Sequence, residues 1–448
     1  MQIADEGRFS KYATTYCSHF KTRTSNQSAT AYKYLKGLFQ GQKRNMERMC
    51  ERVEDSEYYQ LQHFISESPW DHRCVMDQVA NDVSGLLSDS GPVGLLIDES
   101  AHTKKGKHSV GVARQYCGTT GKVDNCQVAV YGALSAGNYY GLIDTELYLP
   151  KEWTGDVKRC RKANVPAERM KHQSKPQLAL AIIKRQLAQG TRFDYVAADG
   201  LYGNDYSLQQ ALDDMGVLFM LEVHKDQYVY TAAPDIFIPE KQVGKGRKPK
   251  RYQTHSRAIE VQQLKEQLQP AVFEEIIVRQ GSKGAIKCKA VAVKIYTWDG
   301  KSSHYNERQL LIRITEAADG KQEVKYAITN AQEDRCTLQQ LVQMQAQRYF
   351  VERAFQEVKQ DAGMSEYQVR GWRAWHHHMA MVMMIQGFIL SEKKLFENEM
   401  PFLSAYDLRE VVILTYAIKG KSYDEAVAQI KRRHQQRKDD IKRNNFKT

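Results

Sequence analysis

Three acidic residues could act together in this sequence. Asp98 and Asp199 each end a short apolar run that is typical of a buried strand. Glu352 lies far along the chain, in a stretch with helical periodicity at 337–361. An acid at the end of a single strand is usually a cap or a turn residue. The prediction therefore depends on the combination of all three.

Arg348, Glu352 and Lys359 share one face of the predicted helix. Because successive helical residues are about 100° apart, Glu352 lies about 40° and Lys359 about 20° from Arg348 around the axis. Such a face could be a solvated surface, with ion pairs worth only about 0.2–0.5 kcal/mol each. Apolar residues flank the stripe, however: Phe350, Val351, Ala354, Phe355 and Val358. The helix is therefore expected to pack closely against another element.

Three carboxylates beside an arginine and a lysine could cleave phosphodiester bonds. That reaction needs an activated water and stabilised charge on a pentavalent phosphorus, and two divalent metal ions about 3.5–4 Å apart can supply both. Mg²⁺ prefers hard oxygen ligands such as Asp98, Asp199 and Glu352 would provide. Arg348 and Lys359 could then bind the flanking phosphates. We expect two Mg²⁺ ions, with Mn²⁺ as a substitute.

The positive charge of the 448-residue chain is localised. The net charge is +12. Residues 241–251 contain six basic residues and no acid, and residues 431–448 contain eight basic and two acidic residues, a net +6. These two segments account for the whole excess. Localised charge on a neutral body suggests a polyanion partner, although solvated, disordered charge explains either segment alone equally well.

Composition argues against several classes of protein. The eight cysteines include no C-x-x-C pair, which disfavours a structural zinc site and a disulfide scaffold. The most apolar stretch, 379–390, is shorter than the roughly 20 residues of a membrane span. No secretion signal is visible, so we expect a cytoplasmic protein without a membrane partner. The three histidines at 376–378 cannot converge on one ion, because consecutive helical residues point about 100° apart.

The order of expected elements is that of an α/β protein. Residues 1–90 have helical character, including a stretch at 31–53. A meander of three strands follows at 93–98, 110–116 and 126–134, and then a helix at 174–189, a strand at 193–199, a helix at 204–215 and a strand at 217–223. Residues 224–325 interrupt this pattern with strand-like segments and a helix at about 256–268. One long helix at 337–361 and an apolar helix at 371–392 complete it.

The spacing Arg348-x3-Glu352-x6-Lys359 resembles the Y-x2-R-x3-E-x6-K signature of insertion-sequence DDE transposases. A larger resemblance is to the insertion-sequence-seven-oh-one group, related to the insertion-sequence-four branch. The stretches that carry it, in the family's order, are 95–100 (LLIDES), 104–116 (KKGKHSVGVARQY), 125–129 (NCQVA), 147–153 (LYLPKEW), 198–203 (ADGLYG) and 367–376 (YQVRGWRAWH). Together they cover most of residues 30–390.

The resemblance implies an RNase-H-like catalytic core with an inserted β-rich module. The first core strand would carry Asp98 and the neighbouring fourth strand Asp199, with Glu352 supplied by a later helix. The corresponding division of the chain has a helical DNA-binding region, two parts of the core separated by the insertion, and a C-terminal helical region with a basic tail. Its boundaries are 1–90, 91–223, 224–325, 326–395 and 396–448.

The resemblance and the charge pattern together suggest DNA contacts. Arg348 and Lys359 would hold phosphates near the cut end, with Gln345 at the position of the signature's tyrosine and still able to donate a hydrogen bond. Trp298 could stack on a flipped base, worth about 1–3 kcal/mol; a tryptophan that covers a small core is the alternative. The basic candidates are Lys104, Lys105, Lys107, Lys245, Lys248, Lys250, Arg247 and Arg251.

The function that the resemblance implies is that of a bacterial DNA transposase. It would cut phosphodiester bonds at the ends of its element and join a 3′-OH to target DNA by in-line attack. We expect double-stranded DNA as partner (terminal inverted repeats and target), a homodimer on paired ends, and association with the nucleoid. The alternatives are a catalytically silent DNA-binding regulator, disfavoured because all three acids are present, and an RNase-H-like nuclease or resolvase, disfavoured by the additional regions.

Overall fold

The structure is a computed structural model. It describes residues 3–40, 43–240, 248–281, 284–316, 320–401 and 403–415, together with residues 435 and 439. Lys245 and Arg247, two of the predicted DNA contacts, lie outside the described residues, as does most of the basic segment 431–448.

A ten-stranded mixed sheet runs through the molecule, in the order β11-β12-β13-β14-β6-β5-β1-β3-β2, with β4 also paired to β3. β1, β3 and β4 form an antiparallel meander, whereas β5 is parallel to β1 and β6 is parallel to β5. This order confirms the predicted α/β class with an RNase-H-like core. The core strands are β1 (Gly94–Thr103), β3 (Lys122–Ala136), β4 (Tyr139–Leu147), β5 (Tyr195–Ala198) and β6 (Phe219–Val223).

The prediction of three meander strands was wrong about one of them. The stretch at 110–116 contains only the short strand β2 (Ala113–Cys117), which pairs with the first residues of β3. The third strand of the meander is β4, which the sequence analysis missed. β4 buries Asp144 and Glu146, so it lacks the apolar pattern of a core strand. Asp144 is compensated by Arg73, 2.6 Å away, and by Arg185, 2.9 Å away.

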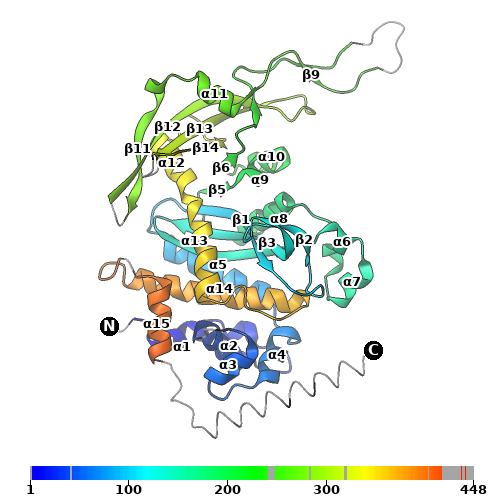
Figure 1. Cartoon of the computed structure of the whole chain (residues 1–448), viewed down its shortest axis with the longest axis vertical. Helices are drawn as coiled ribbons and strands as arrows, with labels where there is room; N and C mark the ends of the chain where they lie inside the picture. Colours follow the sequence, from blue (N-terminus) through cyan, green and yellow to red (C-terminus); the bar gives the residue numbers. More distant parts are fainter. Residues whose placement is uncertain are drawn as a thin grey trace.

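Helices cover both faces of the core sheet (Figure 1). Adjacent residues of a strand point to opposite faces. On β3, the ring of Tyr131 packs 5.2 Å from that of Phe355 on α13 (Tyr349–Asp361), whereas Gly132 faces Ile182 on α8 (Lys175–Gln189). The helix α14 (Trp372–Leu395) packs against β4 and against α5 (His72–Leu87). The sheet is therefore sandwiched between helical layers.

The region 1–90 is helical, as predicted, and it packs on the core. α2 (Ser28–Gln40) and α4 (Tyr58–Ser66) contact α14, below which these helices gather in Figure 1. A buried ion pair of 2.7 Å joins Arg8 to Glu392 of α14. The stretch expected at 31–53 is two helices, the second being α3 (Met46–Arg52). α1 spans Glu6–Thr15.

The insertion extends the core sheet. β14 (Gln322–Thr329) pairs with β6 in antiparallel register, and β13, β12 and β11 follow in order. The helix expected at 256–268 is the shorter α11. The bounds are β7 Tyr228–Val229, β8 Ile236–Phe237, β9 Gln253–Thr254, β10 Ile259–Glu260, α11 Val261–Gln267, η3 Pro270–Val272, β11 Glu274–Gly281, β12 Gly284–Thr297 and β13 Asn306–Glu316.

The helix expected at 337–361 is interrupted at Arg348. α12 (Leu338–Gln347) ends there and α13 begins at the next residue. Arg348 N donates to Gln345 O at 3.3 Å and Val351 N donates to Arg348 O at 3.2 Å. These bonds span three residues, so the chain tightens locally at Arg348. The remaining elements are η1 Cys17–Phe20, α6 Lys151–Thr154, α7 Val157–Lys162, η2 Ala167–Arg169, α9 Gly200–Gly203, α10 Tyr206–Asp214 and α15 Ala405–Thr415.

Candidate active site

Asp98 and Asp199 are brought together by the pairing of β1 with β5. Ile97 is in register with Ala198, so the next residue of each strand is an aspartate at the same level. In-register residues of parallel neighbours point to the same face. Asp199 is the N-cap of α9, and its carboxylate accepts a hydrogen bond of 3.0 Å from Leu201 N. The chain turn after β5 therefore holds this carboxylate in place.

The environment of the two aspartates disfavours negative charge. Burial raises the pKa of Asp98 well above its usual range, and the carboxylate of Asp199 raises it further. Burial, and then the charge of Glu99, raise the pKa of Asp199. The guanidinium of Arg348 opposes the shift at both residues. A pair of buried acids of this kind is stabilised by a nearby cation.

Arg348 supplies that cation in this structure. Its Nη1 lies 3.5 Å from Asp98 Oδ2, and its Nη2 donates to Glu352 Oε1 at 2.8 Å. Burial alone would lower the pKa of Arg348, but Glu222, Asp98 and Glu352 outweigh this effect and raise it. Glu352 is 54% exposed, whereas the side chain of Asp98 is 14% exposed. The third acid therefore lies at the rim of the site.

Glu222 is an acid of this cluster that the sequence analysis missed. It lies on β6, and its Oε2 is 3.1 Å from Arg348 Nε. Its other ion pair, of 3.9 Å, is with Lys325 on β14. A lone glutamate within an apolar strand was the available signal. The neighbouring sequence could not indicate that Glu222 faces Arg348, because the two residues come close only when the chain is folded.

Two further glutamates are turned to other partners. Glu99 accepts from Lys175 Nζ at 2.6 Å and from the Tyr202 hydroxyl at 2.8 Å. Glu357 is buried and pairs with Lys393 instead of facing Glu352. Neither changes the set of acids next to Arg348.

The acids suit a magnesium ion in kind, but they do not converge in this conformation. Carboxylate oxygens are the ligands that Mg²⁺ prefers. Among the described residues, however, no three Asp, Glu, His or Cys side chains lie close enough together to hold a metal ion. Asp98 and Asp199 are adjacent, and Arg348 stands between them and Glu352. A third ligand would require Arg348 to move.

A model of a family described as DDE superfamily endonuclease matches residues 15–285, which is more than half of the chain. The chain belongs to this family. Enzymes of the DDE superfamily depend on metal ions, which agrees with the kind of ligand present here.

A relative of known family supports the predicted resemblance of this DDE endonuclease to the insertion-sequence-seven-oh-one group. A probable transposase for insertion sequence element IS701 from Microchaete diplosiphon is 30% identical over 227 residues, which is 49% of this chain and 55% of the relative. The chain therefore matches about half the length of that relative. A cryo-EM structure of a piggyBac transposase synaptic complex with hairpin DNA covers 94% of this chain and 86% of its own. At 10% identity and a TM-score of 0.36, that likeness is too distant to carry an argument.

Three predicted DNA contacts of the DDE endonuclease are buried or half-buried. Gln345 is 2% exposed, and neither of its side-chain polar atoms has a hydrogen-bond partner in the described structure. Lys104 Nζ lies 3.4 Å from the ring centroid of Tyr367, and burial lowers the pKa of this lysine to about 8. Lys359 Nζ lies 3.4 Å from Thr119 Oγ1, and burial lowers its pKa as well.

Other predicted contacts are accessible. Lys105 and Lys107 are exposed on the loop after β1. Trp298 is half-buried, and its indole N–H donates to Ser302 O at 2.9 Å within the turn that follows β12. This bond fixes the orientation of the indole ring, which remains partly exposed. The described cations of the basic segment in the insertion, Lys248, Lys250 and Arg251, are all exposed.

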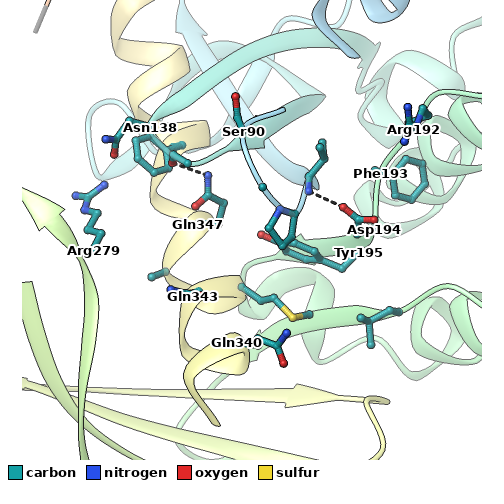
Figure 2. Close-up of a pocket in the computed structure, with 18 of the residues that line it drawn as sticks. Ser90, Asn138, Arg192, Phe193, Asp194, Tyr195, Arg279, Gln340, Gln343 and Gln347 are labelled. Carbon is teal, nitrogen blue, oxygen red and sulfur yellow. Dashed lines mark hydrogen bonds between the residues drawn. The ribbon is translucent and has the colours of Figure 1, made fainter. Parts of the chain in front are cut away.

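A cavity of about 960 Å³ lies at the other end of the core strands. Val93 and Tyr195, at the starts of β1 and β5, line it, whereas the two aspartates follow the ends of the paired segments. Figure 2 shows Gln347 of α12 on one wall, where its Nε2 donates to Gly137 O at 2.9 Å. Asp194 accepts from Val93 N at 2.7 Å. This cavity is therefore separate from the acid cluster.

The three consecutive histidines at 376–378 bind backbone carbonyl groups. All are buried in α14. His376 bonds to Trp372 O at 2.9 Å, and His377 to the carbonyls of Ile65 and Trp70. The bonds of His377 connect α14 to the N-terminal helical region.

In the described part of the chain, no helix is long and apolar enough to span a bilayer.

Proposed function

We propose that this DDE endonuclease is the transposase of a bacterial insertion sequence. It cuts phosphodiester bonds at the ends of its element and joins a 3′-OH to target DNA by in-line attack. The observation that carries the proposal is that Asp98 on β1 and Asp199 directly after β5 lie at the same level of the sheet, beside Arg348 and Glu352. The similarity to a probable transposase for insertion sequence element IS701 supports it.

Asp98, Asp199 and Glu352 are the proposed ligands of two Mg²⁺ ions. The chemistry that two such ions supply when bound is activation of water and stabilisation of charge on phosphorus. Asp199 is oriented by the amino terminus of α9, and the side chain of Asp98 is 14% exposed. Arg348, the residue before α13, and Lys359 on α13 would bind the phosphates beside the scissile bond. Water, not a side chain, is the nucleophile, so no covalent protein–DNA intermediate forms.

An exposed basic surface next to the acids suits the DNA backbone. It joins the loop after β1 to α7, because Arg159 Nη2 donates to Lys107 O at 2.8 Å. It continues to Lys175, whose Nζ lies 2.6 Å from Glu99 beside Asp98. Within the described residues, none of its exposed cations forms an ion pair. They are Lys105, Lys107, Lys158, Arg161, Lys162 and Lys171.

The remaining parts of the proposal concern assembly. Two element ends must be held together for strand transfer, so we expect a homodimer on paired double-stranded ends, in the bacterial cytoplasm at the nucleoid. The region 1–90 and the exposed cations of the insertion would add contacts to the terminal repeats. Phosphate contacts of this kind provide affinity and position more than sequence specificity.

The decisive experiment incubates the purified full chain with Mg²⁺ and a labelled duplex that carries the end of the host element. Asp98→Ala should bind the duplex in a gel shift but lose cleavage by a factor on the order of 10³ or more. Glu397→Gln, far from the acids in sequence and exposed, should cut like wild type. If wild type binds but cuts with neither Mg²⁺ nor Mn²⁺, the chain is a silent DNA-binding regulator. Cleavage without strand joining would indicate a nuclease or resolvase.

A further inference from the structure

We propose that Arg348 is a latch on the metal site and that Glu222 is the positioning residue that holds it. Without metal or DNA, the guanidinium acts as an internal counter-ion of the acids and keeps Glu352 apart from Asp98 and Asp199. The inference rests on the proposed function for the identity of the metal ligands. It goes beyond that function in assigning Glu222 a role and in predicting a closed resting state.

Arg348 contacts carboxylates from three different elements. It reaches Asp98 on β1, Glu222 on β6 and Glu352 on α13, at 3.5, 3.1 and 2.8 Å. Its side chain is only 10% exposed. A guanidinium in the midst of these acids offsets part of their negative charge, at the place where a divalent cation would offset more of it. Metal ligation by Glu352 together with the aspartates therefore requires these contacts to break.

Two cations on the neighbouring strands of the sheet could pair with Glu222 if Arg348 moved away. Glu222 is in register with Ala327, and Lys325 lies two residues away on the same face of β14. Arg313 on β13 is in register with Lys325 and so belongs to the same polar row. Arg313 is 9% exposed, and its Nε has no hydrogen-bond partner in the described structure. Burial lowers the pKa of Arg313, and the charge of Glu222 opposes that shift. Two cations of the insertion thus remain to compensate Glu222 when Arg348 leaves.

The junction between α12 and α13 lies at Arg348 itself. Arg348 sits at the single residue where the two helices meet, in the tightened turn with bonds spanning three residues. Gln345, three residues earlier on the same side of the helix, is buried with both amide atoms unpaired in the described structure. Buried polar groups are nearly always hydrogen-bonded in folded proteins, so the unpaired amide of Gln345 makes this conformation of the junction costly.

Metal binding without DNA tests the latch directly. Mn²⁺ binding to the metal-free full chain is followed by the electron paramagnetic resonance of free Mn²⁺, with no DNA present. We expect Arg348→Gln to bind Mn²⁺ about tenfold more tightly than wild type, equivalent to about 1.4 kcal/mol. Glu222→Gln, which removes one of the three partners of Arg348, should bind a few-fold more tightly. Arg353→Gln, on the exposed side of the same helix, should match wild type.

The outcomes separate the latch from the proposed function. Unchanged or weaker Mn²⁺ binding by both Arg348→Gln and Glu222→Gln, with Asp98→Asn still abolishing binding, would overturn the latch and leave the metal site standing. If Asp98→Asn binds Mn²⁺ like wild type, the acids are not the metal site and both proposals fail. Because Arg348→Gln could unfold, Arg348→Lys is measured beside it, with circular dichroism melting of each variant. A folded Arg348→Lys that binds like wild type supports the latch, since it keeps the internal cation.

Discussion

The Nε of Arg348 lies 3.1 Å from Oε2 of Glu222, which joins the start of α13 to strand β6. β6 pairs with β14, the strand through which the chain returns from the insertion. The insertion and the acid cluster therefore share one continuous sheet and one polar row.

The close packing of α9 on β6 should make Gly203 intolerant of a side chain. A Cβ at Gly203 would lie 1.8 Å from the carbonyl oxygen of Glu222. Gly203→Ala must therefore push α9, which Asp199 caps, away from β6. We expect a loss of about 3 kcal/mol in the free energy of unfolding and a loss of cleavage. Urea denaturation and the cleavage assay measure both.

Gly85→Ala is the matched control for that substitution. Gly85 lies in α5, and a Cβ there would meet no heavy atom within 4 Å. Replacement by alanine should stabilise the helix by about 0.5–1 kcal/mol and leave cleavage unchanged. Equal destabilisation by both substitutions would contradict the packing explanation.

The buried charge of Asp144 should be essential for stability. It is fully buried on β4, and it pairs with Arg73 of α5 and Arg185 of α8. Burial favours the neutral acid, but the two arginines outweigh it and lower the pKa of Asp144. Asp144→Asn removes the charge that pairs with Arg73 and leaves Arg185 with Glu146 alone, and we expect it to lower the free energy of unfolding by about 3–5 kcal/mol. A loss no larger than that of the exposed control Glu397→Gln in thermal melts would show that the network contributes little.

The buried Lys104 should make stability depend on alkaline pH. Burial lowers its pKa from 10.5 to about 8. Between these values the unfolded chain binds more protons at this site than the folded chain, so the free energy of unfolding rises with pH. From pH 8 to 10.5 wild type should gain up to about 3 kcal/mol relative to Lys104→Met. Urea denaturation at both pH values measures the gain, and Lys105→Met should keep the wild-type response.

The basic surface on α7 should determine how DNA binding responds to salt. The triple variant of Lys158, Arg161 and Lys162 to Gln removes up to three phosphate contacts. Each contact contributes about 0.9 to the slope of log affinity against log salt, so the slope should fall by up to about 2.7. Fluorescence anisotropy between low and moderate salt gives the slope. Lys184→Gln, exposed on α8, should leave it unchanged, and a triple variant with the wild-type slope would place the DNA elsewhere.

Local sequence patterns determined much of the core. The apolar runs before Asp98 and Asp199 could be satisfied only in a buried sheet, and burial on both faces places these strands at its centre. Helical periodicity put Arg348, Glu352 and Lys359 on one face, as the structure has them on or beside α13. These predictions succeeded because each depends on the repeat of a single strand or helix, which a short stretch of sequence contains.

Only the tertiary structure decided which charges meet. β4 was missed because the acid Asp144 breaks its apolar pattern, and the arginines that compensate it come from two separate helices. Glu222 faces Arg348 for a similar reason, since β6 is placed beside β5 by sheet order and not by any nearby residue. Ion pairing depends on distance in space, whereas periodicity records only which side of an element is buried. The sequence therefore determined the strands and the face that carry the acids, and the fold alone determined that an arginine occupies their centre.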